Sequence, residues 1–367
     1  MWRFENLMMT LRSLVKRTLL FINLLCILLF LLSCLAPFIS PQKFWVTAFL
    51  GLGFLPLLVT NFFWIIFWLL FKRKLALISV IAVLLGSWNI GNHFSIASCL
   101  PFSGNGSFSV MSFNVKVFDL YTWNNYPGSK DALLQVIENA DPDVLCLQEF
   151  YANDSEQPSS VASLKKKYPY LHFEKTFTVK GHNHWGIATF SKFPITGRSV
   201  IKFPNAFQNI AVATDIVIKD DTVRIFNAHM QSIYIGSDDY ENMSGLHGSE
   251  KVKYSLWKIF RKIKEAFFKR TEQAELLAGQ IAKSPHRVLV CADFNDTPNS
   301  YTYKTISAGL NDSFKEAGCG IGCTFSSNRP IFRIDYVLAD KRIRVCSHQV
   351  IWNFTSDHFA VKAWLDL

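Results

Sequence analysis

Two polar side chains follow an apolar, strand-like run in the C-terminal half of the chain. Val288–Cys291 is continuously apolar, and Asp293 and Asn295 come shortly after it. Residues two apart on an extended chain share one face, so we expect this carboxylate and this amide to point the same way. One polar strand end can simply open a loop, so a functional interpretation needs support from other segments.

Five further apolar runs have the same kind of neighbour. Each of the six segments places a carboxylate, an amide or an imidazole beside an expected strand: Ser112-Phe113-Asn114, Leu147-Gln148-Glu149, Asn227-Ala228-His229, Asp293-Phe294-Asn295, Arg333-Ile334-Asp335-Tyr336 and Ser356-Asp357-His358. Six such segments are hard to explain as loop openings, because burying acids without partners is costly. The repeated pattern therefore predicts one site built from several strand ends.

Strand-like and helix-like segments alternate over residues 108–367. The apolar patterns predict strands at 108–115, 144–147, 185–191, 210–218, 223–230, 288–291, 334–338 and 359–364. They predict helices over about 129–139 and 251–283, the second stopped by Ser284-Pro285. Mixed strands and helices over this length indicate one large α/β domain.

The tripeptides at the strand ends resemble those of a known superfamily. SFN, LQE, DFND, RIDY and SDH occur here in the order and at the spacings typical of the endonuclease/exonuclease/phosphatase superfamily. The resemblance covers about residues 108–367. It implies two packed β-sheets flanked by helices, with the active site at one end of the sandwich. It also implies hydrolysis of a phosphate ester with a divalent cation, usually Mg²⁺, with Mn²⁺ as the alternative.

The same resemblance assigns metal ligands and water-orienting residues. Glu149 matches the principal metal ligand of the superfamily, and Asn114 and Asp357 match its supporting residues. Mg²⁺ prefers hard oxygen ligands and keeps several waters, so one or two carboxylates suffice to hold it. Asp293 and Asn295 match the pair that orients the attacking water and a phosphate oxygen.

Two histidines have matches as well. His358 and Asp335 match a His–Asp pair, in which the carboxylate raises the pKa of the imidazole and fixes its tautomer. His229 matches a second histidine placed near the leaving group, and a core histidine is the alternative. Arg333 could equally hold a loop or face phosphate. Ala292 stands where the superfamily usually has Gly, and a small side chain is expected to fit there.

The first hundred residues have a different composition. Three long apolar runs follow one another there, at about 18–37, 44–71 and 75–97. Each approaches the ~20 residues that a helix needs to cross the hydrocarbon core of a bilayer. We therefore predict three transmembrane helices within residues 1–100, a polar linker over 101–107 and a catalytic domain over 108–367.

Charge predicts the orientation of these spans. Residues 1–99 hold eight Lys or Arg and one acid, a net +7 of the chain's +10. Most of them lie before the first span or between the second and third, which the positive-inside rule places in the cytoplasm. Three spans then put the catalytic domain outside the cytoplasmic membrane, on the periplasmic side. An alternative interprets Leu31-Leu32-Ser33-Cys34 as a lipoprotein cleavage site, which leaves the domain on the same side.

The remaining domain is only weakly charged, at about +3, so the high pI gives no argument for a nucleic-acid partner. One segment of it is strongly basic: residues 251–270 hold eight basic residues and one acid. We favour an outer helix with a solvated basic face, and a helix that contacts anionic lipid is the alternative. A Cys319–Cys323 bridge and a pair of free thiols both remain open.

Three functions are consistent with these observations. The first is a membrane-anchored phosphodiesterase or phosphomonoesterase acting on a phosphate ester such as a lipid headgroup, with membrane lipid as a further partner. The second is an extracytoplasmic nuclease. The third is a catalytically inactive membrane receptor or scaffold, which the intact set of motifs disfavours. The sequence indicates no protein partner.

Overall fold

The chain divides into two compact units. The computed structural model describes residues 2–97, 108–120, 128–233, 249–325, 332–353 and 355–367. One unit holds residues 1–92 with 299–301, and the other holds 93–298 with 302–367. The predicted linker at 101–107 lies outside the described residues.

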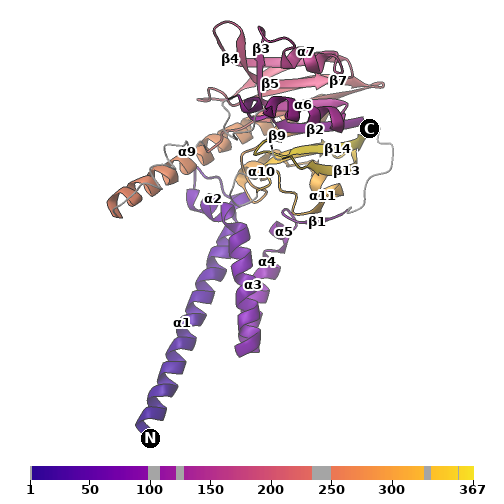
Figure 1. Cartoon of the computed structure of the whole chain (residues 1–367). Helices are drawn as coiled ribbons and strands as arrows, with labels where there is room; N and C mark the ends of the chain where they lie inside the picture. Colours follow the sequence, from indigo (N-terminus) through magenta and orange to yellow (C-terminus); the bar gives the residue numbers. More distant parts are fainter. Residues whose placement is uncertain (1, 98–107, 121–127, 234–248, 326–331, 354) are drawn as a thin grey trace. The chain divides into compact units, whose positions relative to one another are not determined.

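The second unit is built on two six-stranded mixed sheets (Figure 1). The first has the order β13 (Arg344–Ile351), β14 (Ala360–Asp366), β2 (Phe108–Asn114), β3 (Val144–Asn153), β5 (Asn183–Ser191), β4 (Tyr170–Val179). The second has the order β10 (Leu310–Asp312), β12 (Asp335–Asp340), β9 (Arg287–Asp293), β8 (Asp221–His229), β7 (Ile210–Ile218), β6 (Ile195–Lys202). The pairs β2–β3 and β8–β9 are parallel.

Alternation along the strands separates an inner from an outer face of each sheet. Val110 and Cys146 of the first sheet share an apolar cluster with Leu289 and Val337 of the second, so these residues fill the space between the sheets. Their neighbours along each strand point outward, as the period of two requires. The two-sheet sandwich predicted from the sequence is thus confirmed.

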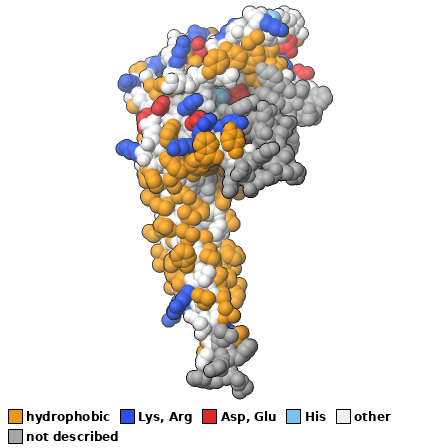
Figure 2. Space-filling view, turned by 90° about the vertical axis from the view of Figure 1, so that its left-hand side faces the viewer, with side chains coloured by type: hydrophobic (Ala, Val, Ile, Leu, Met, Phe, Trp, Pro, Cys, Tyr) orange, Lys and Arg blue, Asp and Glu red, His pale blue; other side chains and the backbone are white. Residues whose placement is uncertain are grey.

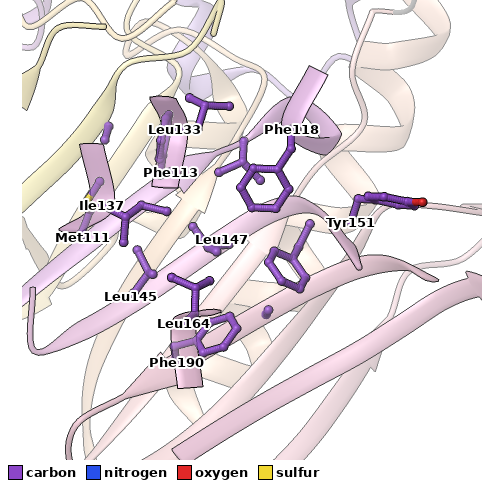
Figure 3. Packing of buried hydrophobic residues seen from close by; sticks show 14 of the residues in the cluster. Met111, Phe113, Phe118, Leu133, Ile137, Leu145, Leu147, Tyr151, Leu164 and Phe190 are labelled. Atoms are coloured by element: carbon purple, nitrogen blue, oxygen red, sulfur yellow. The ribbon is translucent and has the colours of Figure 1, made fainter. Parts of the chain in front are cut away.

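Helices cover both outer faces. Leu133 and Ile137 of α6 (Ser129–Ala140) and Leu164 of α7 (Ser160–Lys165) pack with Phe113 and the other outward residues of the first sheet (Figure 3). The second sheet is covered by α9 (Ser249–Ala282) and α10 (Tyr301–Ile306). Fully burying a Leu, Ile or Phe side chain contributes ~1.5–3 kcal/mol, so these layers hold the sheets rigidly in place.

Short elements complete this unit. They are η2 (Lys116–Asp119), α11 (Ser313–Ala317) and a two-stranded ribbon of β1 (Ser95–Ile96) and β11 (Cys319–Gly320). Cys319 is disulfide-bonded, whereas Cys323 is a buried thiol outside any disulfide. The predicted Cys319–Cys323 bridge is therefore absent, because Cys323 is not in a disulfide. The alternative prediction, that both thiols are unlinked, is also wrong, because Cys319 is in a disulfide.

The first unit is helical. Its elements are α1 (Trp2–Cys34), η1 (Ala36–Phe38), α2 (Trp45–Leu52), α3 (Phe54–Phe71), α4 (Arg73–Leu85) and α5 (Ser87–Ile90). Hydrophobic side chains cover most of the surface of these helices (Figure 2). Within the described residues, two stretches are long and apolar enough to cross a membrane, Met8–Phe38 and Phe54–Phe71.

The third predicted span, at 75–97, does not form as one helix. It is divided into α4 and α5 at Gly86 and ends in strand β1. The 13 residues of α4 rise ~20 Å, which falls short of the ~30 Å hydrocarbon core. Gly86, Asn89, Gly91 and Asn92 interrupt the apolar run after Leu85, in the part where Trp88, Asn89, Asn92 and His93 already make the sequence pattern weaker.

Polar contacts join the three longest helices of this unit. The Asn23 side chain on α1 donates to Ser79 Oγ on α4 at 2.9 Å and accepts from Trp68 Nε1 on α3 at 2.9 Å. All three side chains are buried. Buried polar groups among apolar helices fix which faces meet, because no other partner satisfies them.

Candidate active site

The register of the second sheet brings three predicted residues into one row. His229 at the end of β8 is paired with Asp293 at the end of β9, and Asp293 is paired with Asp335 at the start of β12. Each lies two or four residues from an inner-face apolar residue, so all three side chains point between the sheets. Hydrogen bonding along two strand pairs therefore assembles an imidazole and two carboxylates at one end of the sandwich.

Asn114 connects this row to the first sheet. Its amide Nδ2 lies 3.0 Å from Asp293 Oδ2 and 3.2 Å from Glu149 Oε1. Asn114 is the last residue of β2 and continues the inner face of Val110 and Ser112. One buried amide thus binds the two carboxylates that the sequence assigned to different roles.

Glu149 reaches the site because β3 is irregular there. The register of β3 against β5 shifts between Leu147 and Phe150, and Glu149 has a φ of +47°. In a regular strand Glu149 would share the outward face of Leu147. A bulge adds one residue and re-aims the side chain, at a cost of ~1–3 kcal/mol for a non-glycine residue in the left-handed region.

Asp293 is the most buried acid of the site, with no exposed surface. The backbone N–H of Asn295 donates to its Oδ1 at 2.8 Å. Burial raises the pKa of Asp293, and the neighbouring Asp335 raises it further, against the opposing effect of the two histidines. The Asn295 side chain donates to the Met230 carbonyl at 3.0 Å, which fixes the turn after β9.

His358 and Asp335 form a pair. His358 Nδ1 lies 3.1 and 3.2 Å from the two oxygens of Asp335, and its Nε2 lies 3.9 Å from Asp293 Oδ2. Burial lowers the pKa of His358, but Asp335 and Asp293 outweigh burial and raise it to about 10. The imidazole is therefore held as a cation with its Nε2 facing Asp293.

His229 faces the same acids. Its Nε2 lies 3.4 Å from Glu149 Oε1 and 3.9 Å from Asp293 Oδ2. This nitrogen is buried and makes no hydrogen bond with any described residue. A buried polar atom without a hydrogen bond is expensive in a purely structural position, so its direction toward the acids favours a role in the site.

Asp357, the third predicted metal-binding residue, forms an ion pair. Its Oδ2 lies 2.9 Å from Lys116 Nζ, while its Oδ1 is buried and makes no hydrogen bond with any described residue. The assignment of Asn114, Glu149 and Asp357 as metal-binding residues stays a prediction. Lys116, which lies two residues after Asn114, was not singled out in the sequence.

The residues at this end of the sandwich fit a divalent cation. Carboxylate oxygens of Asp293 and Asp335 lie within 4.8 Å of each other, and the partly exposed Glu149 is adjacent. His358, held as a cation, supplies no ligand. Carboxylate oxygens are the ligands that Mg²⁺ and Mn²⁺ prefer. Closely spaced buried acids repel one another, so a bound cation would relieve a repulsion that is built into the fold.

Other polar residues of the sequence motifs hold the sheets together. Gln148 of the LQE motif donates to Asn227 Oδ1 at 2.8 Å, which links β3 to β8 between the sheets.

Arg333 forms a buried ion pair with Asp312 at 2.7 Å and lies against the rings of Phe314 and Tyr336. Arg333 therefore holds a loop, which was one of its two predicted roles.

Comparison with known proteins identifies the family. The family model described as endonuclease/exonuclease/phosphatase family matches residues 111–358. A second model, for a domain of unknown function, matches residues 16–93. No curated protein matches the chain.

Solved structures share the fold of the second unit. An endonuclease/exonuclease/phosphatase from Beutenbergia cavernae is 19% identical with a TM-score of 0.50, covering 71% of this chain and 71% of that one. D. rerio TDP2, humanised by 14 mutations, is 15% identical with a TM-score of 0.50, covering 71% of this chain and 99% of that one. Because the family match extends over more than half of the sequence and includes all six strand-end motifs, the chain belongs to the endonuclease/exonuclease/phosphatase family.

Proposed function

We propose that the protein is a membrane-anchored, metal-dependent hydrolase of a phosphodiester or phosphomonoester. Members of its family act on phosphate esters. The observation that carries the proposal is the row His229–Asp293–Asp335, joined through Asn114 to Glu149 and through Asp335 to His358. Closely packed buried acids and imidazoles are typical of hydrolytic sites that bind a cation.

Each group has a proposed role in an in-line attack of water on phosphorus. Asp293 is held by the Asn295 backbone and by Asn114, and it orients the water and accepts its proton. His358, kept cationic by Asp335, stabilises negative charge on a phosphate oxygen. We assign to His229 the protonation of the leaving oxygen.

Glu149 and Asn114 would hold Mg²⁺ or Mn²⁺, with Asp357 as the outer member of the set. When bound, the cation stabilises charge on the phosphate and on the leaving oxygen. Asn114 would take part by positioning the Glu149 carboxylate, because its amide donates to Glu149 and Asp293 while its Oδ1 accepts from the Lys116 backbone N–H at 3.0 Å. The Lys116 side chain holds Asp357 in place through their ion pair.

We further propose that the domain lies outside the cytoplasm. The disulfide at Cys319 supports this, because disulfides persist in oxidising compartments. With the N-terminus in the cytoplasm, this location requires an odd number of membrane-crossing segments. α1 and α3 would supply two of them, so α4 and α5 together would have to supply the third. Their helical residues, 73–85 and 87–90, would rise ~27 Å only if both helices ran in line across Gly86, which is close to the thickness of the hydrocarbon core.

An extracytoplasmic nuclease is the second candidate, and one observation favours it. Tyr151, Trp185, Phe177 and Phe207 follow one another with ring-centroid separations of 5.1, 4.6 and 5.6 Å. The series begins two residues after Glu149 and ends at Phe207, which is 76% exposed. Bases stack on exposed aromatic rings for ~1–3 kcal/mol each, so Phe207→Ala would weaken oligonucleotide binding without affecting a small ester.

Turnover by the full-length protein in detergent tests the proposed activity. Bis(p-nitrophenyl) phosphate, p-nitrophenyl phosphate, single-stranded DNA and phospholipid vesicles would each be offered with Mg²⁺, with Mn²⁺ and with a chelator. We expect hydrolysis of at least one ester, loss with the chelator and recovery on adding Mg²⁺. Folded protein that hydrolyses none of these esters with either cation would support an inactive receptor or scaffold instead.

A further inference from the structure

The N-terminal part of α9 has a surface that the proposed catalysis does not use. We call residues 254–264 the α9 tip. Three of its large side chains are exposed, namely Tyr254 at 69%, Leu256 at 53% and Trp257 at 56%. Three large exposed apolar side chains within one turn are unusual for a helix that only covers a sheet.

The rest of α9 is packed in the ordinary way. Ala274 and Leu277 are fully buried in the cluster that covers the second sheet, and Phe267 is nearly so. The end of α9 that contains the tip extends away from the two sheets (Figure 1). The tip is therefore not required to complete the hydrophobic core of the domain.

The outward face of α9 changes character along its length. Trp257 and Glu275 are 18 residues apart, which is five full turns, so they lie on the same face of the helix. The face is aromatic at Tyr254 and Trp257 and acidic at Glu272 and Glu275, all of which are exposed. A solvated outer helix would carry charge along the whole stripe, whereas this one carries apolar rings at one end.

Basic side chains accompany the apolar ones. Lys258, Arg261, Lys262 and Lys264 all lie in the tip. The Arg261 guanidinium lies 5.3 Å from the centre of the Trp257 ring, and its Nε lies 3.5 Å from Glu265. The tip thus combines interfacial aromatic residues with several positive charges, in a domain whose overall charge is small.

We propose that the α9 tip docks on the surface of a bilayer that contains anionic lipids. Trp and Tyr are suited to the boundary between headgroups and acyl chains, because one part of each side chain is apolar and another is polar. Lys and Arg attract anionic headgroups, each strengthening binding by about fivefold near the surface. Leu256, exposed on another side of the same helix end, favours a lipid surface over nucleic acid, which offers no apolar layer to receive it.

The proposal goes beyond the proposed function by naming a second membrane contact. It rests on the proposed anchoring only because an anchored chain keeps the tip near a bilayer. The two claims can fail separately. Co-migration of the chain with lipid nanodiscs reports anchoring, whatever the tip does.

Photo-crosslinking of the full-length protein in nanodiscs tests the tip directly. A benzophenone amino acid would replace Trp257, and the matched control would carry it in place of Glu275. Nanodiscs of phosphatidylcholine alone would be compared with nanodiscs containing phosphatidylglycerol. We expect lipid adducts at position 257 but not at 275, and at least about tenfold more of them with the anionic lipid.

Neutralised variants control for the charge. Arg261→Gln, Lys262→Gln and Lys264→Gln together should reduce the anionic-lipid adducts at position 257 about tenfold or more. The same three changes at 165–167, an exposed basic run at the end of α7, should leave them unchanged. Equal lipid adducts at 257 and 275, or adducts at 257 only to a second copy of the chain, would overturn the proposal.

Discussion

Asp335 and His358 form the pair of residues on which the charge of the site depends most. Among the neighbouring charges, Asp335 raises the pKa of His358 the most, and its carboxylate lies 3.1 Å from Nδ1. In Asp335→Asn the imidazole loses its nearest negative charge and its fixed tautomer. We expect kcat to fall by ~10²–10⁴-fold, with a displaced pH profile.

Asp340→Asn supplies the control for this prediction. Asp340 lies at the other end of β12 and pairs with the exposed Arg342. Its replacement should leave kcat and the pH profile unchanged. Equal kcat values for the Asp335 and Asp340 variants would remove Asp335 from the mechanism.

The sequence predicts the kinds of residue at the site better than their exact contacts. Period-two alternation explains why Asn114, His229, Asp293 and Asp335 point between the sheets. It does not explain Glu149, whose direction depends on a bulge with no local signal in LQE. Nor does it place Asp357, because the Lys116 ion pair forms between segments far apart in the chain.

Between elements, His172 makes one of the bonds that join the two sheets. It lies on β4, and its Nδ1 is 2.8 Å from Thr214 Oγ1 on β7. Burial lowers the pKa of His172 to about 4, with a smaller effect of Arg198. The unfolded chain therefore binds the proton first as the pH falls.

This pair predicts acid sensitivity of the fold. The pKa of His172 is lower in the folded than in the unfolded chain, so the free energy of unfolding is highest above pH ~6.5 and decreases as the pH falls toward ~4. The decrease due to this one group is at most ~3 kcal/mol. We expect the Tm of the full-length protein to fall over this range, and to fall less steeply in His172→Gln. Thr214→Val should lower Tm but keep the steep fall, and an unchanged slope in His172→Gln would contradict the argument.

In the N-terminal unit, Gly86 allows two helices to approach closely. A Cβ atom placed there would lie 2.6 Å from Cζ of Phe30 on α1. At Gly91 the nearest atom would be 3.6 Å away. We expect Gly86→Ala to lower the Tm of this unit, because overpacking against Phe30 reduces the free energy of unfolding by ~1–3 kcal/mol. Gly91→Ala should have little effect. Similar Tm changes in the two variants would show that Phe30 readily moves aside.

The predicted strands lie in the interiors of the sheets. All eight correspond to observed strands, from β2 to β14. The strands that the sequence did not reveal include β4, β6, β10 and β13, and these are the four edge strands. Edge strands carry exposed polar residues rather than continuous apolar runs, so hydrophobicity alone does not distinguish them from loops.

For the whole molecule, the side of the membrane depends on whether α4 and α5 cross. We expect a reporter fused after Leu367 to be active only outside the cytoplasm. The result follows if three helical segments cross and the basic residues before the first remain inside. A reporter active only in the cytoplasm would mean that α1 and α3 alone cross, or that none does.

The central claim is that strand ends from two sheets converge on one hydrolytic centre. Turnover of a phosphate ester by full-length protein carrying Asp293→Asn, compared with the natural sequence at saturating Mg²⁺, tests it most directly. The account predicts a loss of ~10²-fold or more with an unchanged Tm, because Asp293 is the acid that orients water. Unchanged turnover by the folded variant would contradict it.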